Sequence, residues 1–165
     1  MARNAFYSFH YKPDCSRASL VRNMGVIEGN QPASDNDWET VTKGGDKAIQ
    51  KWINDQLEGR SCAIVLIGEN TANRKWINYE IVTAWNQNKG VLGVHIHRLK
   101  DFAQLQSQKG ANPFDHITLG STGKKLSTVV PVFDPPYSDS KDAYAYIKAN
   151  LSDWIEKAIS ARSNN

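Results

Sequence analysis

Hydrophobic residues occur along the chain in two patterns: short continuous apolar runs, and longer segments in which apolar residues return every three or four positions. The first pattern is typical of strands covered on both faces, and the second of helices with one buried face. The runs predict strands at residues 4–10, 61–68, 91–97 and 129–133, with a further short strand at 37–41. The periodic segments predict helices at residues 14–24, 46–58, 74–89 and 142–161.

Polar residues and glycines mark where the predicted helices begin and end. A side-chain oxygen just before a helix can accept hydrogen bonds from the first free backbone N–H groups, and a glycine commonly ends a helix. The expected N-caps are Asp14, Asp46 and either Thr71 or Asn73. The expected stops are Gly25, Gly59 and Gly90.

The alternation of strands and helices predicts an α/β fold with a parallel sheet, because parallel strands need crossover connections that cover the sheet. We expect a single domain over residues 1–165, with five strands in the flavodoxin-like order 2-1-3-4-5 and helices on both faces. Pro131 lacks a backbone donor and predicts that the last strand lies at the sheet edge. Residues 98–128 are too long for an ordinary connection and predict a lid or a small subelement.

Composition and charge exclude several classes of protein. The 165 residues are 40% hydrophobic and 22% charged, which is enough for one substantial core. The net charge is only +3 and the basic residues are scattered, so no nucleic-acid surface is expected. Cys15 and Cys62 are too few for a disulfide framework. Because no apolar run is long enough to span a membrane, we expect a cytoplasmic protein without membrane contact.

The carboxyl ends of the first and third predicted strands indicate where a ligand binds. Open parallel sheets bind ligands beyond these ends, near the point where the strand order reverses. Ser8, Phe9 and His10 follow the first strand, and residues 68–73 follow the third. Glu80 lies on the helix that leaves the same corner.

Glu80 can be interpreted in two ways. On a helical wheel it lies beside the apolar stripe of Ile77 and Ile81, so the pattern predicts neither full solvation nor a core position. Composition alone favours a surface glutamate paired with Arg74 or Lys75, since most glutamates are solvated. A carboxylate that belongs to a ligand site is the alternative.

A family resemblance changes this balance. Trp76, Glu80 and Ile81 form a W-x-x-x-E-I pattern that resembles the active-site helix of Toll/interleukin-1 receptor (TIR) domains. The chain is most similar to the TIR-like group that contains the Thoeris antiphage defence protein B. The matching segments follow the order of that family: FYSFHY at 6–11, VRN at 21–23, VLIG at 65–68, residues 74–81, GVHIH at 93–97 and NPFD at 112–115. The resemblance implies that Glu80 is the catalytic residue.

The resemblance also implies a reaction, the cleavage of NAD+ between nicotinamide and ribose to give a cyclic or conjugated ADP-ribose signal. One carboxylate is sufficient because nicotinamide leaves as a neutral pyridine, whereas the alkoxide leaving group of a glycosidase needs a general acid. We expect Glu80 to be ionised and to stabilise the positive charge that develops on the ribose. NAD+ is then the substrate, and no cofactor is expected.

Further side chains are expected to bind the substrate. Ser8 and His10 could donate to ribose or phosphate oxygens, although either could be an internal polar group. Trp76 would form a wall of the site or belong to the core. The other expected substrate-binding residues are Phe9, Tyr79 and Trp38, the last of which lies in the segment that corresponds to the mobile loop of TIR domains.

Two weaker signals concern charged groups and metal ligands. Lys12 and Arg17 could contact a pyrophosphate or form a solvated helix start. His95 and His97 lie two residues apart on one strand face, but a zinc site needs a third ligand and only His116 is near in sequence. Polar residues at the end of a buried strand explain the pair, so no metal is expected.

Two other functions remain open from the sequence, a non-catalytic TIR-type interaction module and a glycosyl transferase of the nucleoside deoxyribosyltransferase type. The partners implied by the resemblance are NAD+, a downstream effector that binds the nucleotide product, and a phage-derived trigger. The sequence leaves a homo-oligomer open and predicts neither nucleic acid nor membrane as a partner.

Overall fold

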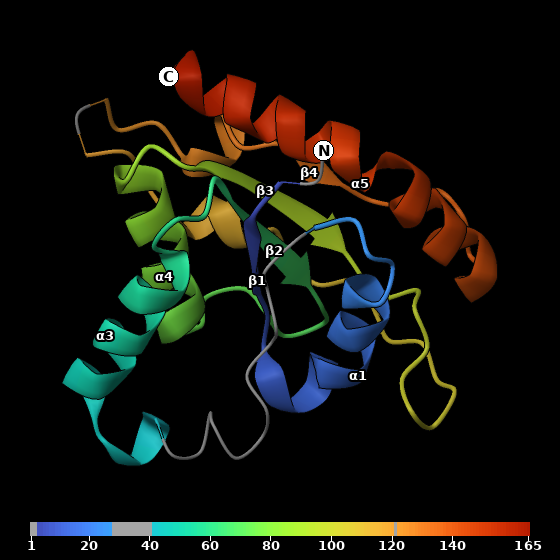
Figure 1. Cartoon of the computed structure of the whole chain (residues 1–165). Coiled ribbons are helices and arrows are strands. Elements are labelled where there is room, and N and C mark those ends of the chain that lie inside the picture. Colours follow the sequence, from blue (N-terminus) through green and yellow to red (C-terminus); the bar gives the residue numbers. More distant parts are fainter. Residues whose placement is uncertain (1–2, 28–40, 121) are drawn as a thin grey trace.

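A computed structural model of the chain describes residues 3–27, 41–120 and 122–165 (Figure 1). Its described strands form one parallel sheet in the order β1-β2-β3-β4. The strands are β1 (Ala5–Ser8), β2 (Cys62–Ile67), β3 (Gly90–His95) and β4 (Val132–Phe133). Every residue of β1, β2 and β3 is buried, which is the burial that their continuous apolar runs predict.

Helices cover both faces of the sheet, as predicted. The helices α1 (Tyr11–Arg22) and α5 (Ser140–Ser163) pack on one face, and α3 (Asp46–Leu57) and α4 (Lys75–Asn86) pack on the other (Figure 1). Alternate strand residues therefore point into two separate apolar layers, so that the side chains of β2 contribute to both. No helix within the described ranges is both long and apolar enough to cross a membrane.

The structure does not support the prediction of five strands in the order 2-1-3-4-5. The described part of the chain contains four strands, which lie in sequence order across the sheet. The predicted second strand falls on residues 37–41, of which 37–40 lie outside the described residues, and Val41 is helical. The edge position of the last strand is confirmed.

The predicted side-chain N-caps are wrong for all three helices. The helix α1 begins at Tyr11, three residues before Asp14, and the N-cap positions of α3 and α4 are Gly45 and Arg74, none with a side-chain cap. Gly45 has a φ of 86°, a left-handed conformation that glycine adopts without strain. Thr71 instead accepts a hydrogen bond from the Gly68 amide at the end of β2. The side chains predicted as N-caps therefore do not cap these helices, and that of Thr71 makes a different contact.

The long segment at residues 98–128 is a subelement that contributes to the core. It contains two short 3-10 helices, η1 (Pro113–His116) and η2 (Leu126–Thr128). Phe114 and Leu126 are fully buried in the apolar layer beneath α3 and α4. The segment is therefore held by the hydrophobic effect, which the polar composition of residues 98–128 did not reveal.

Gly93 in β3 makes room for this packing, so Gly93→Ala is expected to lower the free energy of unfolding by about 1–3 kcal/mol. A Cβ at Gly93 would lie 2.7 Å from Ile67 Cδ1 and 3.0 Å from Phe114 Cε2. Urea unfolding measures the change. Gly120→Ala is the control, because a Cβ there meets no atom within 4 Å. Equal stabilities of the two variants would contradict the tight packing of Phe114 on β3.

Candidate active site

Glu80 is a buried residue, 6% exposed, in the middle of α4. The neighbours Ile77 and Ile81 place this side of α4 on the sheet, and Glu80 is carried into the same interface. A surface glutamate paired with Arg74 or Lys75 is therefore excluded. The burial of Glu80 is compatible with the alternative interpretation, a carboxyl group that belongs to a ligand site.

Ser8 provides the hydrogen-bond partner of Glu80. The last residue of β1, Ser8 is buried, and its hydroxyl donates to Glu80 Oε2. Alternation along β1 directs Ala5 and Tyr7 toward α1 and α5, and Phe6 and Ser8 toward α3 and α4. Two residues that are 72 positions apart in sequence thus meet at the carboxyl end of β1. The contact of Ser8 with ribose or phosphate stays a prediction.

Burial raises the pKa of Glu80 from 4.5 to about 8, although the hydrogen bond from Ser8 opposes the shift. The physical cause is the loss of water around a charge, which favours the neutral acid. This burial favours the protonated carboxyl group at neutral pH, whereas the sequence analysis expected an ionised one. A bound cation beside the carboxyl group would favour the ionised form again.

The raised pKa of Glu80 predicts how stability depends on pH. The folded state binds a proton at Glu80 that the unfolded state releases above pH 4.5, so the free energy of unfolding falls as pH rises toward 8. Between pH 6 and pH 8, the free energy of unfolding of the wild type should fall by about 2 kcal/mol more than that of Glu80→Gln. Urea unfolding of both proteins at several pH values measures this difference, in which the titration of other groups cancels. A constant difference would contradict the raised pKa.

Phe9, which follows Ser8, lies on the face of the sheet opposite to Glu80. The ring of Phe9 packs on the α1 and α5 side of the sheet and stacks on Tyr11, with 5.8 Å between ring centroids. His10 is the N-cap residue of α1 and is half-buried, and its Nδ1 has no hydrogen-bond partner among the described residues. Burial and the charge of Arg74 lower the pKa of His10. His10 is thus a neutral imidazole near the start of α4, where it could still meet a ligand.

Trp76 and Tyr79 lie on α4 beside the apolar layer and are both half-buried. Their rings meet edge to face, with 5.7 Å between centroids, and Lys75 Nζ lies 4.8 Å from the centroid of the Trp76 ring. The hydroxyl of Tyr79 donates to Asn54 Oδ1 on α3 at 3.3 Å. These contacts give both rings a packing role, and their contact with a substrate stays a prediction. Trp38 lies outside the described residues.

A buried ion pair in α1 is a feature that the sequence did not predict. Asp14 and Arg17 are both buried, with Arg17 Nη1 at 3.3 Å from Asp14 Oδ1. Burial raises the pKa of Asp14, although Arg17 opposes the shift. Gly68, at the end of β2, is needed there because a Cβ would collide with the Asp14 carboxylate. Arg17 is thus neither solvated nor available to a pyrophosphate. Its position three residues after Asp14, on the same face of the helix, was the sequence signal from which the ion pair could have been predicted.

His95 and His97 are buried at the end of β3, with 5.8 Å between ring centroids. Burial lowers the pKa of His95 to about 4 and also lowers the pKa of His97. Both rings are therefore neutral at physiological pH. In the part of the chain that the structure describes, no three His, Cys, Asp or Glu side chains are arranged to hold a metal ion.

A parallel sheet with helices on both faces is the α/β architecture of TIR-like domains, and Glu80 is buried on the sheet side of α4. Residues 6–101 match the family described as Thoeris protein ThsB, TIR-like domain. A protein of Bacillus cereus named "Putative cyclic ADP-D-ribose synthase ThsB1" is 38% identical over 133 residues, which cover 76% of this chain and 69% of that protein. The chain belongs to the ThsB TIR-like family, as its motifs predicted.

Proposed function

We propose that this protein is an enzyme that cleaves NAD+ between nicotinamide and ribose and releases a cyclic form of ADP-ribose. The observation that carries the proposal is the buried carboxyl group of Glu80, held by Ser8 at the carboxyl end of β1. The name of the Bacillus cereus relative, which specifies a cyclic ADP-ribose as the product, supports the proposed product. NAD+ would be the substrate, and no further cofactor is required by this chemistry.

The reaction begins when the bond between ribose C1′ and the nicotinamide nitrogen breaks. Both electrons of that bond stay with nicotinamide, which leaves as a neutral molecule. Positive charge then develops on C1′ and the ring oxygen of the ribose. An anion fixed beside the sugar stabilises this charge, and the effect is larger in a site of low dielectric constant than in water.

The same carboxyl group accounts for the second half of the reaction. A nucleophilic atom of the adenosine part bonds to C1′ and loses a proton, which the ionised Glu80 can accept. The raised pKa of Glu80 makes it a better proton acceptor than an ordinary carboxylate. Capture of C1′ by water instead would give linear ADP-ribose.

The preference of the buried Glu80 side chain for its protonated form at neutral pH is compatible with this role. The nicotinamide ring of NAD+ carries a positive charge, and a nearby opposite charge favours the ionised carboxylate. Binding of the substrate would therefore generate the anion that the cleavage needs. In the antiphage role that the family implies, a phage-derived trigger would control this step and an effector protein would bind the product.

The proposal is tested by incubating the purified chain, and lysates of cells that express it with and without phage, with isotope-labelled NAD+. Mass spectrometry should detect free nicotinamide together with a product that has the mass of ADP-ribose minus one water. Linear ADP-ribose alone would refute the cyclic product but retain NAD+ cleavage. Absence of nicotinamide from infected cells would refute the enzyme, and base exchange on deoxynucleosides would indicate a deoxyribosyltransferase.

A further inference from the structure

Buried polar atoms without a hydrogen-bond partner gather at the carboxyl ends of β3 and β4, outside the site of Glu80. Among the described residues, these unpartnered atoms include His95 Nδ1, His97 Nδ1, Ser107 Oγ and Asp134 Oδ1. The pairing of Val94 with Phe133 places the next residues of both strands side by side, and neighbouring residues of parallel strands point to the same face. Asp134 therefore lies beside His95. Buried polar groups are usually satisfied, so this cluster needs a physical explanation.

Residues 105–112 form a strap that crosses the carboxyl ends of β2 and β3 and contacts this cluster. The Ser107 amide donates to the His97 carbonyl at 2.9 Å. Gly110 lies directly on the end of β2, since a Cβ there would collide with the Gly68 carbonyl oxygen. The strap therefore covers the edge at which open parallel sheets bind ligands.

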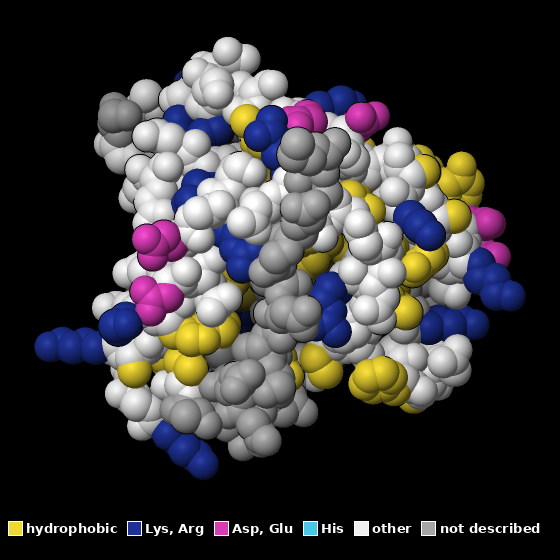
Figure 2. All heavy atoms as spheres, viewed as in Figure 1, with side chains coloured by type: hydrophobic (Ala, Val, Ile, Leu, Met, Phe, Trp, Pro, Cys, Tyr) yellow, Lys and Arg dark blue, Asp and Glu magenta, His cyan; other side chains and the backbone are white. Residues whose placement is uncertain are grey.

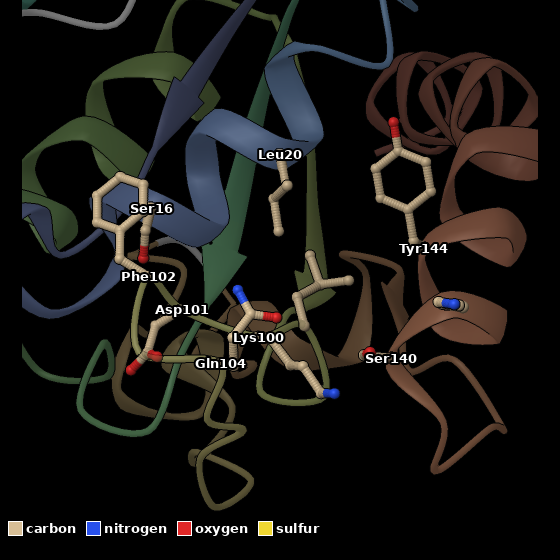
Figure 3. Close-up of a pocket in the computed structure, with 10 residues that line it drawn as sticks. Ser16, Leu20, Lys100, Asp101, Phe102, Gln104, Ser140 and Tyr144 are labelled. Carbon is tan, nitrogen blue, oxygen red and sulfur yellow. The ribbon is translucent and has the colours of Figure 1, made fainter.

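Polar contacts hold the strap, since none of its side chains belongs to either apolar layer. The 98–107 loop, whose last residues begin the strap, borders a hollow of about 370 Å³ between α1 and the start of α5 (Figure 3). Arg17 Nη2 donates to the Leu105 carbonyl at 2.9 Å, and Lys109 Nζ lies 2.9 Å from Asp134 Oδ2. A segment with few buried apolar contacts can open without unfolding of the whole domain.

The His97 ring is placed so that protonation removes one of its contacts. Its Nε2 accepts from Arg98 Nε at 3.4 Å, so the hydrogen of the neutral ring lies on Nδ1. A second proton must bind to Nε2, where it removes this hydrogen bond and places an imidazolium against the Arg98 guanidinium. Because the His97 carbonyl accepts from the Ser107 amide, displacement of His97 also releases the strap.

The charges around the two buried rings are mostly positive. The charged groups that act on one or both rings are Asp134, Lys109, Arg98 and Arg17, and among the described residues α4 and η1 contribute none. The one carboxylate, Asp134, is already paired with Lys109. Other Lys and Arg side chains are scattered over the face shown in Figure 2, where water and salt screen them. Burial and the nearby cations thus favour neutral rings in the closed state.

We propose that the strap is an acid-opened cover of the carboxyl ends of β2 and β3, which protonation of His95 and His97 releases. In the closed state an imidazolium is buried among cations, whereas in the open state water surrounds it. Protonation therefore favours the open state, in which the end of β2 is exposed. This inference does not depend on the activity proposed for Glu80.

The test is amide hydrogen exchange of the ¹⁵N-labelled full chain, followed by NMR and corrected for the intrinsic exchange rate at each pH. The open state binds protons below the ordinary histidine pKa of 6.5, whereas burial lowers the pKa of His95 in the closed state to about 4. Opening therefore becomes more favourable as pH falls through this interval. The open population at the Ser107 amide should rise at least about tenfold from about pH 7 to about pH 5. It should also exceed that at the Leu92 amide in β3, which exchanges only when the sheet unfolds.

Histidine variants identify the groups that respond to pH. The double variant His95→Gln/His97→Gln should lose the pH dependence at Ser107, because neither position can then bind a proton. His116→Gln is the matched control, since His116 is exposed on η1, and it should keep the pH dependence of the wild type.

A third variant tests the ion pair that holds the strap. Lys109→Gln alters an exposed side chain and so retains the fold, and it should raise the open population at about pH 7 by up to about fivefold. It should also weaken the pH dependence, because Asp134 is then free to pair with an imidazolium.

Several results would overturn the proposal: equal open populations at Ser107 at both pH values, the wild-type pH dependence in the double variant, or opening at Ser107 only together with Leu92. If the double variant does not fold, the Lys109→Gln variant and the comparison of Ser107 with Leu92 in the wild type decide the question.

Discussion

Replacing Glu80 with Gln is expected to lower the rate of NAD+ cleavage roughly 10²- to 10³-fold, which is the typical loss when one electrostatic contact to a transition state is removed. Gln has the same shape as Glu, and its side-chain oxygen can still accept from Ser8. It cannot become an anion, so the charge on the ribose is left without stabilisation. We expect the Glu80→Gln variant to remain folded, because it replaces a buried neutral carboxyl group with a neutral amide of the same shape.

Release of nicotinamide from labelled NAD+ measures this effect under conditions in which the wild type is active. Glu69→Gln is the matched control, because Glu69 follows β2 at the same corner but is exposed. Its activity should equal that of the wild type. A Glu80→Gln enzyme that retains most of its activity would remove Glu80 from the mechanism.

The pH dependence of the same reaction distinguishes two roles of Glu80. The ratio kcat/KM reports the free enzyme, so it should rise with pH to about 8 if the ionised carboxylate is the active form. If Glu80 instead acted as a general acid, kcat/KM would fall as pH rises through 8. Ser8→Ala should move the rise to higher pH, because the hydrogen bond from Ser8 lowers the pKa of Glu80.

Replacing Arg17 with Ala is expected to lower the free energy of unfolding by about 3–5 kcal/mol, the usual cost of leaving a buried charge without its partner. The variant leaves the Asp14 carboxylate unpaired inside the protein. It also removes the donors to the Leu99 and Leu105 carbonyls, of which the first is buried. Arg17→Lys should not restore stability, since one ammonium group cannot reproduce the three directions of a guanidinium.

Urea unfolding of the Arg17→Ala variant measures this loss, and Arg22→Ala on the same helix is its control. Arg22 forms no ion pair with the described residues, so its replacement should cost less than about 0.5 kcal/mol. Adding Asp14→Asn to Arg17→Ala should recover part of the stability, because it removes the unpaired charge. Equal losses for Arg17→Ala and Arg22→Ala would contradict the role of Arg17 as an anchor of the 98–107 loop.

Much of the fold could be predicted from local patterns. The 3.6-residue period that includes Ile77 and Ile81 predicted α4, and the continuous run at 61–68 predicted a strand covered on both faces. These features depend on neighbours in sequence, so periodicity is sufficient to find them. The helix starts were predicted less well, because the side chains of Asp14 and Thr71 pair with Arg17 and Gly68, each three residues away, and do not cap a helix.

The sequence by itself determined the class of fold, the family and the identity of Glu80 as the candidate carboxylate. Only the tertiary structure decided that Ser8 meets Glu80, that Phe9 points to the opposite face of the sheet and that Arg17 anchors a distant loop. It also decided the protonation of Glu80, since a pKa depends on how much water the folded chain removes from the group. Desolvation and long-range pairing arise only when segments far apart in sequence pack together, and no local pattern encodes them.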